Sequence, residues 1–171
     1  MAHLQVSERE TYQREGWVVP QWRLPPPRVA AMRGALDRLI ADNPAIRPEK
    51  LVSAHIAGKN AEGVRGSQAF LDLAMDPDLV ELVADVIGQD IILWGCQVFC
   101  KPGGDGLETP WHQDGHYWPI RPLATCTIWL ALDPSTRANG CLLNINIFLQ
   151  QMYDKMRSSF MCNRSNVSLF V

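Results

Sequence analysis

Residues 111–122 read W-H-Q-D-G-H-Y-W-P-I-R-P and set His112 two positions before Asp114. The segment has strand character, and in an extended strand residues i and i+2 share a face about 6.6 Å apart. An imidazole and a carboxylate on one face can converge on a single cation, as they do in 2-His-1-carboxylate metal sites. The spacing therefore predicts that His112 and Asp114 are metal ligands.

The stretches on either side of this segment predict a sheet. Residues 91–100 (I-I-L-W-G-C-Q-V-F-C) and 123–132 (L-A-T-C-T-I-W-L-A-L) are rich in the β-branched, aromatic and apolar residues that favour strands. Residues 101–110 form a loop by their glycines and prolines, and a turn at 133–140 leads into an apolar stretch at 141–149. A ligand pair between two apolar strands is typical of a pocket at the mouth of a barrel.

The chain before residue 88 is predicted to be mainly helical. Ser7 and Glu10 form a capping-box pattern for a short helix that Gly16 ends, and the apolar residues 17–19 then predict a strand. A helix is predicted from the prolines at 25–27 to Asn43 and Pro44, and another near Ser67 to Met75 after a glycine-rich loop at 58–66. The next helix is predicted to be capped by Asp76 and Pro77, with Pro77 at its first position and Gly88 just beyond its end.

Helices followed by strands predict an α+β domain whose sheet is a barrel or jelly roll. At 171 residues the chain is long enough to bury the core of a single domain. We divide residues 1–171 into a mainly helical part at 1–88, a jelly-roll core with the metal motif at 89–142, and an atypical tail at 143–171.

Composition narrows the class of partner. With 16 basic and 18 acidic residues and a net charge of -2, the chain has no broad attraction for nucleic acid or anionic membranes, so we expect a small-molecule partner. The N-terminus is too charged for a signal peptide, and no apolar stretch reaches the roughly 18 residues of a membrane span. Five cysteines, an odd number without regular spacing, favour a reducing compartment, so the cytoplasm is expected. Cys96, Cys100, Cys126 and Cys141 lack the spacing of a zinc site and are expected to pack in the core.

The pattern H-Q-D-x-H-Y-x-P-x-R-P from His112, followed by Trp129 and by N-G-C-L at 139–142, resembles the phytanoyl-CoA dioxygenase family. The resemblance is strong over residues 91–142. It implies an Fe(II)- and 2-oxoglutarate-dependent oxygenase on a double-stranded β-helix, with His112 and Asp114 as the iron ligands. It also implies that Gln97 and Trp129 line the 2-oxoglutarate pocket.

His116, Tyr117 and Trp118 are expected to line the substrate entrance or to hold the following loop. In a straight strand His112 and His116 would lie about 13 Å apart, too far to share one metal. The carboxylate of Asp114 favours hydroxylation, because related halogenating enzymes give up this ligand to chloride.

The family pattern continues with a distal histidine and with an arginine that binds the far carboxylate of 2-oxoglutarate. No histidine follows His116, and Arg157 and Arg164 are candidates for the arginine by residue type alone. We therefore expect a dioxygenase acting on a small-molecule or acyl substrate, impaired in this chain, with a jelly roll left incomplete by truncation or alteration after Leu142. The alternative is an inactive form that acts through an exposed sheet edge. A third hypothesis is a cupin-like isomerase or a binding protein that uses a different divalent metal.

Overall fold

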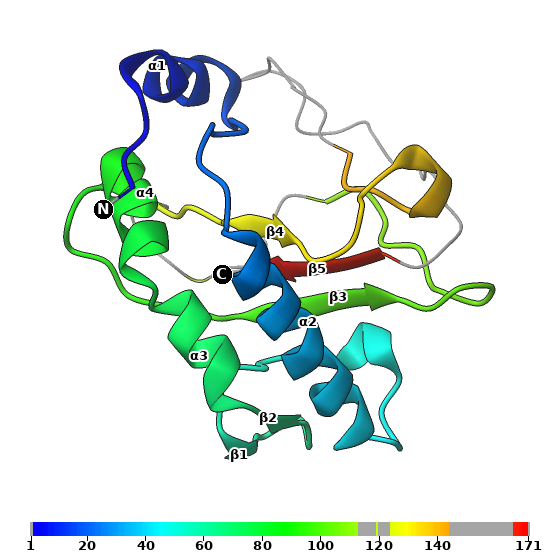
Figure 1. Ribbon diagram of the computed structural model, residues 1–171. Helices are drawn as coiled ribbons and strands as arrows, with labels where there is room; N and C mark the ends of the chain where they lie inside the picture. Colours follow the sequence, from blue (N-terminus) through cyan, green and yellow to red (C-terminus); the bar gives the residue numbers. More distant parts are fainter. Residues whose placement is uncertain (1, 113–118, 120–123, 144–165, 171) are drawn as a thin grey trace.

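The computed structural model describes residues 2–112, 119, 124–143 and 166–170 (Figure 1). Its helices are α1 (Val6–Glu15), α2 (Pro26–Ala41), α3 (Gln68–Ala74) and α4 (Pro77–Ile87), with short 3-10 helices η1 (Pro48–Lys50) and η3 (Arg137–Asn139). Its strands are β1 (Gly58–Lys59), β2 (Arg65–Gly66), β3 (Gln97–Lys101), β4 (Trp129–Ala131) and β5 (Asn166–Phe170). The four described α-helices precede the larger sheet, as the α+β prediction requires.

The capping box of α1 is formed by Gln5 and Glu8, so the prediction that Ser7 and Glu10 form it is wrong. The Gln5 N–H donates to Glu8 Oε2 over 2.9 Å. Glu8 Oε1 accepts from the N–H of Gln21 over 2.5 Å, and the Glu8 side chain is buried. Because Glu8 also binds the following segment, a tertiary contact selects the start of the helix.

Gly16 ends α1 in the left-handed region, with φ 76°, as predicted. The strand predicted at residues 17–19 is wrong, since this part of the chain is coil and exposes both Trp17 and Val19. An apolar run forms a strand only where a neighbouring strand can accept its hydrogen bonds, and no described strand pairs with this one.

α2 begins among the prolines and ends just before Asn43, as predicted. It buries Met32, Ala35, Leu36 and Leu39, a repeat of three and four residues that keeps one face toward the core. The buried Asn43 amide donates to the carbonyl of Leu39 over 2.7 Å and accepts from the N–H of Arg65 over 2.7 Å. This side chain therefore joins the end of α2 to β2.

Local caps set the start of α3 and α4, and the cap of α4 at Asp76 is the predicted one. The Ser67 hydroxyl accepts from the N–H of Ala69, and the Asp76 carboxylate accepts from the N–H of Asp78. Residues 58–66, predicted to be a loop, contain the two-residue strands β1 and β2, which pair antiparallel. Asn60 holds this hairpin by accepting from Val64 N–H over 2.9 Å.

β3, β5 and β4 form an antiparallel sheet in that order. The predicted strand at 91–100 is half right, because residues 91–96 form no strand, and Ile92 is 89% and Trp94 61% exposed. Likewise the described part of the predicted strand at 123–132 pairs only over Trp129–Ala131. The tail contributes the central strand β5, which its composition did not predict.

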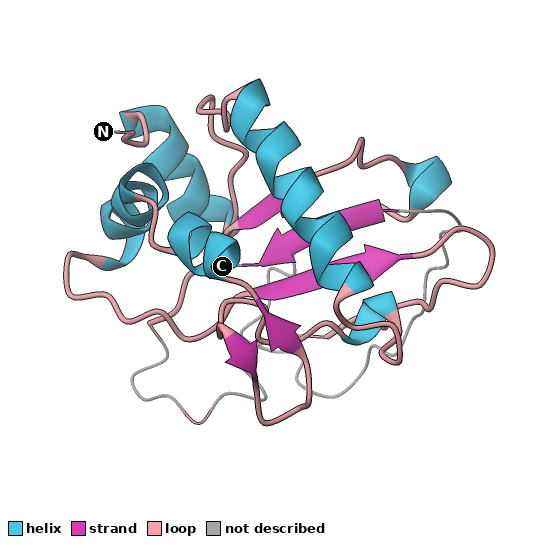
Figure 2. Cartoon of the chain, turned by 60° about the horizontal axis from the view of Figure 1, so that its bottom comes forward, coloured by secondary structure: helices cyan, strands magenta, loops and turns pink. Residues whose placement is uncertain are grey.

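One hydrophobic core lies between the helices and one face of this sheet. α2 crosses that face (Figure 2), and Val98 and Cys100 of β3 join its buried leucines in a single cluster. Further members come from α3, α4 and the loop after η1: Leu51, Phe70, Leu73, Leu79 and Leu82. Among the described residues, no helix has the length and apolar composition that a membrane span needs.

Candidate metal and cofactor site

Gln97 and Trp129 lie in one row of the sheet. Each is paired with Phe170 of the intervening β5, Gln97 from β3 and Trp129 from β4. Residues at one register position point to the same side of a sheet. Their neighbours Val98 and Leu130 pack against the core, so Gln97 and Trp129 face the side opposite the helices. Gln97 is exposed and Trp129 is half-buried.

The loop after β3 has a tight turn that leads toward His112. Gly104 adopts φ 98°, a left-handed conformation that favours glycine. A Cβ on Gly106 would lie 2.6 Å from the carbonyl oxygen of Pro102, closer than side chains tolerate. The two glycines therefore permit a reversal that larger residues would strain.

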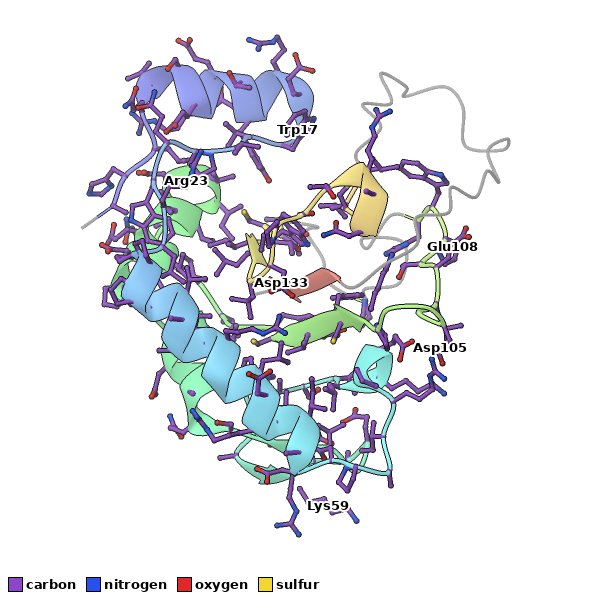
Figure 3. All side chains as sticks on the ribbon, turned by 45° about the vertical axis from the view of Figure 1, so that its right-hand side comes forward. Trp17, Arg23, Lys59, Asp105, Glu108 and Asp133 are labelled. Atoms are coloured by element: carbon purple, nitrogen blue, oxygen red, sulfur yellow. The ribbon has the colours of Figure 1, made fainter. Side chains whose placement is uncertain are left out.

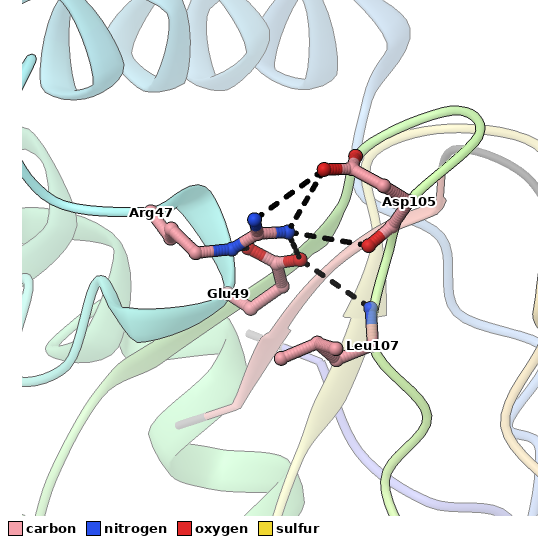
Figure 4. A network of polar contacts seen from close by, with 4 residues as sticks. All are labelled: Arg47, Glu49, Asp105 and Leu107. Atoms are coloured by element: carbon pink, nitrogen blue, oxygen red, sulfur yellow. Dashed lines mark hydrogen bonds and ion pairs between the residues drawn. The ribbon is translucent and has the colours of Figure 1, made fainter.

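A polar network joins this loop to η1 (Figure 4). The Arg47 guanidinium donates to both carboxylate oxygens of Glu49, over 2.8 and 3.3 Å, in a bidentate fork. It also donates to the Asp105 carboxylate over 3.3 Å and to the Asp105 carbonyl over 3.2 Å. Glu49 in turn accepts from the N–H of Leu107 over 3.3 Å.

This network shifts the ionisation of its members. The hydrogen bonds from Arg47 lower the pKa of Glu49 below its ordinary value, and Glu49 raises the pKa of Arg47. Sequence analysis missed these residues, because nothing in R-P-E at 47–49 indicates a partner 58 residues away. On the same loop, Asp105 and Glu108 both lie toward the outer edge of the molecule (Figure 3).

His112 is exposed and lies outside any strand, so the prediction of a strand at this residue is wrong. Its Nδ1 lies 2.7 Å from the carbonyl oxygen of Pro110. A carbonyl oxygen can only accept, so this contact requires the proton on Nδ1 and leaves the lone pair on Nε2. Metal-bound histidines commonly have their second ring nitrogen held in this way.

The other predicted residues of the motif lie outside the described residues: Asp114, His116, Tyr117 and Trp118. Within the described ranges, no group of three or more histidine, cysteine, aspartate and glutamate side chains could hold a metal ion. Gln97 and Trp129 are brought together on one face of the sheet, whereas His112 lies on the loop that follows β3.

Two of the described cysteines pack in the core and are poorly suited to binding a metal. Cys96 and Cys100 are buried in the core, as predicted, and neither forms a disulfide. Burial raises the pKa of Cys96 to about 12 and that of Cys100 to about 11, so neither thiol is a ready metal ligand. Burial also raises the pKa of Cys126, while a hydrogen bond with Tyr12 of α1 opposes that rise.

A second ion pair fixes the turn after β4. Asp133, which follows that strand (Figure 3), accepts a short hydrogen bond from Arg33 of α2. Arg33 also lies 3.6 Å from Asp37 one helical turn along. The helix thereby holds the end of β4 as well as covering the sheet.

Comparison with known proteins gives a consistent set of relatives. The family model described as Phytanoyl-CoA dioxygenase (PhyH) matches residues 12–146. An ectoine dioxygenase of Streptomyces anulatus is 26% identical over 145 residues, which cover 80% of this chain and 48% of the relative. A probable phytanoyl-CoA dioxygenase of Caenorhabditis elegans is 29% identical over 160 residues, covering 82% and 51%. The chain thus spans about half the length of these relatives.

A solved structure described as CytC3 with Fe(II) and alpha-ketoglutarate is also similar. It superposes with a TM-score of 0.58 at 21% identity, over 98% of this chain and 67% of that chain. A second CytC3 structure matches equally well, at a TM-score of 0.58 and 68% of that chain. At this identity the likeness shows a shared fold.

Proposed function

The chain belongs to the phytanoyl-CoA dioxygenase family, and from this premise we propose that it serves an Fe(II)- and 2-oxoglutarate-dependent hydroxylation of a small-molecule or acyl substrate. The observation that carries the proposal is the family match over residues 12–146, which includes the His112 and Asp114 pair. The named dioxygenases among its relatives support the same class of reaction.

His112 and Asp114 are the proposed iron ligands. The contact of His112 Nδ1 with Pro110 supports this role, because it presents Nε2 as the coordinating nitrogen. A carboxylate at position 114 supplies a hard oxygen ligand and one negative charge to a divalent ion. Dioxygen would be the oxidant of the hydroxylation, and bound Fe(II) would let it react with 2-oxoglutarate, which gives up two electrons as it is decarboxylated to succinate.

Gln97 and Trp129 are proposed to line the 2-oxoglutarate pocket. Their common row places them two strand spacings apart, about 9.6 Å, on the face opposite the described helices. A Gln97 amide can donate to a carboxylate, and the Trp129 ring offers an apolar wall with one donor. His116, Tyr117 and Trp118 are proposed, from their place in the motif, to line the substrate entrance.

The wider architecture is proposed on the same basis. The three-stranded sheet would be part of a jelly roll in a single domain, which the continuous core from Leu4 to Leu132 supports. The four described cysteines are free thiols, which supports the proposal of a reducing compartment such as the cytoplasm.

Activity of this chain alone is proposed to be impaired, because no histidine follows His116 to complete the iron site. The second candidate is an inactive form that acts by protein interaction. It is favoured by the exposed apolar side chains of Ile92 and Trp94, which lie in the coil segment before β3.

Anaerobic titration with Fe(II) and 2-oxoglutarate, followed by exposure to oxygen, tests the proposal. We expect about one iron per chain, lost in His112→Ala and Asp114→Ala and kept in His3→Ala, an exposed histidine outside the motif. Succinate release would support an active enzyme, and iron without succinate an impaired one. Full iron occupancy in the double variant lacking both ligands would overturn the assignment.

A further inference from the structure

The network around Glu49 has a half-buried centre and an exposed rim. The side chain of Glu49 is 11% exposed, that of Arg47 46% and that of Asp105 74%. Glu49, the least exposed of the three side chains, thus receives the Arg47 fork and the Leu107 N–H. Three donors, two of them in a bidentate fork, fix the orientation of the carboxylate more closely than a single ion pair does.

The network anchors the loop close to His112. Leu107, whose amide Glu49 accepts, lies five positions before that histidine. Between them Pro110 restricts the backbone and supplies the carbonyl that the imidazole binds. The turn at Gly104 and Gly106 fixes the other end of the loop next to β3. The path to His112 therefore has two fixed points.

We propose that Arg47 and Glu49 are positioning residues, which hold the loop at 102–110 through Asp105 and Leu107 and so direct the His112 imidazole toward the metal. The inference rests on the proposed function. Binding sites need their ligands held to within about 0.5 Å, and a loop reaches that precision only when other groups support it. Neither Arg47 nor Glu49 would touch the metal itself.

A positioning role differs from a merely structural one in what it changes. Exposed ion pairs contribute little to global stability, so loss of Arg47 should leave the unfolding midpoint nearly unchanged. Local opening of the loop should rise instead, since such opening depends on the few contacts that hold the segment. The orientation of His112 should change with it, whether or not metal is present.

Arg47→Ala, Glu49→Gln and Asp105→Asn test the proposal against Arg14→Ala. The control removes an arginine from α1 that pairs with Glu15 over 2.8 Å, the same distance as the pair between Arg47 and Glu49. In Arg47→Ala we expect about tenfold faster exchange of the Leu107 amide. We also expect a weaker Nδ1–H signal of His112 in the metal-free protein and about threefold weaker Fe(II) binding. Arg14→Ala should change none of these.

The readouts separate this inference from the proposed function. Unchanged exchange of the Leu107 amide in both Arg47→Ala and Glu49→Gln would overturn the proposal that Arg47 and Glu49 hold the loop at 102–110. Faster exchange with the wild-type His112 signal and Fe(II) affinity would overturn the positioning of the ligand. If the wild-type protein takes up no Fe(II), the proposed function fails. The Nδ1–H signal of His112 in the metal-free protein then decides whether Arg47 and Glu49 orient the imidazole.

Discussion

The two faces of the larger sheet differ in how completely they are covered. On one face, Val98 and Cys100 are buried in the core together with fully buried side chains such as Leu36 of α2 and Phe70 of α3. On the other face, Gln97 is exposed and Trp129 only half-buried. The covered face supplies the apolar burial that stabilises the fold, whereas the open face keeps polar and aromatic groups accessible to a ligand.

Truncating the covered face should give the largest effect. Leu36→Ala removes a fully buried side chain of α2 and should lower the free energy of unfolding by about 2–5 kcal/mol. Ile92→Ala, at an 89% exposed position, should change it by less than about 0.5 kcal/mol. Urea denaturation measures both, and equal losses at the two positions would contradict the contrast between covered and exposed surfaces.

Alkaline pH should destabilise the covered face next. The Cys96 thiol ionises near pH 9.0 in the unfolded chain, but burial raises its folded pKa to about 12. The folded state then keeps a proton that the unfolded state loses, so stability should fall above pH 9.0 by about 1.4 kcal/mol per pH unit for this thiol. Cys96→Ala should remove this part of the slope and Cys141→Ala should not. Identical slopes in the two variants would refute the assignment.

Removing a helix cap should have a smaller effect. Asp76 accepts from the N–H of Asp78 at the start of α4 and lies 2.6 Å from Arg28 of α2. Asp76→Ala should lower the free energy of unfolding by about 1 kcal/mol, because the first turn of α4 loses its side-chain acceptor. Asp72→Ala, on the exposed side of α3, should cost less than about 0.5 kcal/mol. Thermal unfolding of both variants provides the check.

Acid should release the loop before it unfolds the core. The folded pKa of Glu49 lies below its unfolded value of 4.5, so its stabilising contribution is complete above pH 4.5 and is lost as pH falls through the folded pKa. We expect protection of the Leu107 amide to decline over that lower range, after correction for intrinsic exchange. Glu49→Gln should show no such decline, and a decline of equal size in that variant would point to another group.

Sequence analysis succeeded where a structure is set by adjacent residues. Gly16, Ser67 and Asp76 mark helix ends through contacts within a few positions, and each lies where predicted. It failed where a distant partner decides. The strand expected at 17–19 finds no described neighbour, and the start of α1 depends on the contact of Glu8 with Gln21.

The candidate site shows the same division. The residue types and spacing of the motif identify His112 and led to the confirmed family. The common row of Gln97 and Trp129 depends on β5, which comes from a tail with no clear periodicity. The contact between Arg47 and Asp105 joins segments 58 residues apart, so no local sequence pattern predicts it.

The alternation of β3 makes this arrangement sensitive to chain length. Inserting one residue between the end of α4 and β3 without a compensating bulge would invert the parity of the strand. The Gln97 side chain would then point into the hydrophobic core beneath α2, and the Val98 side chain would point toward solvent. An insertion at this junction should therefore disturb the apolar core and the row of Gln97 and Trp129 together.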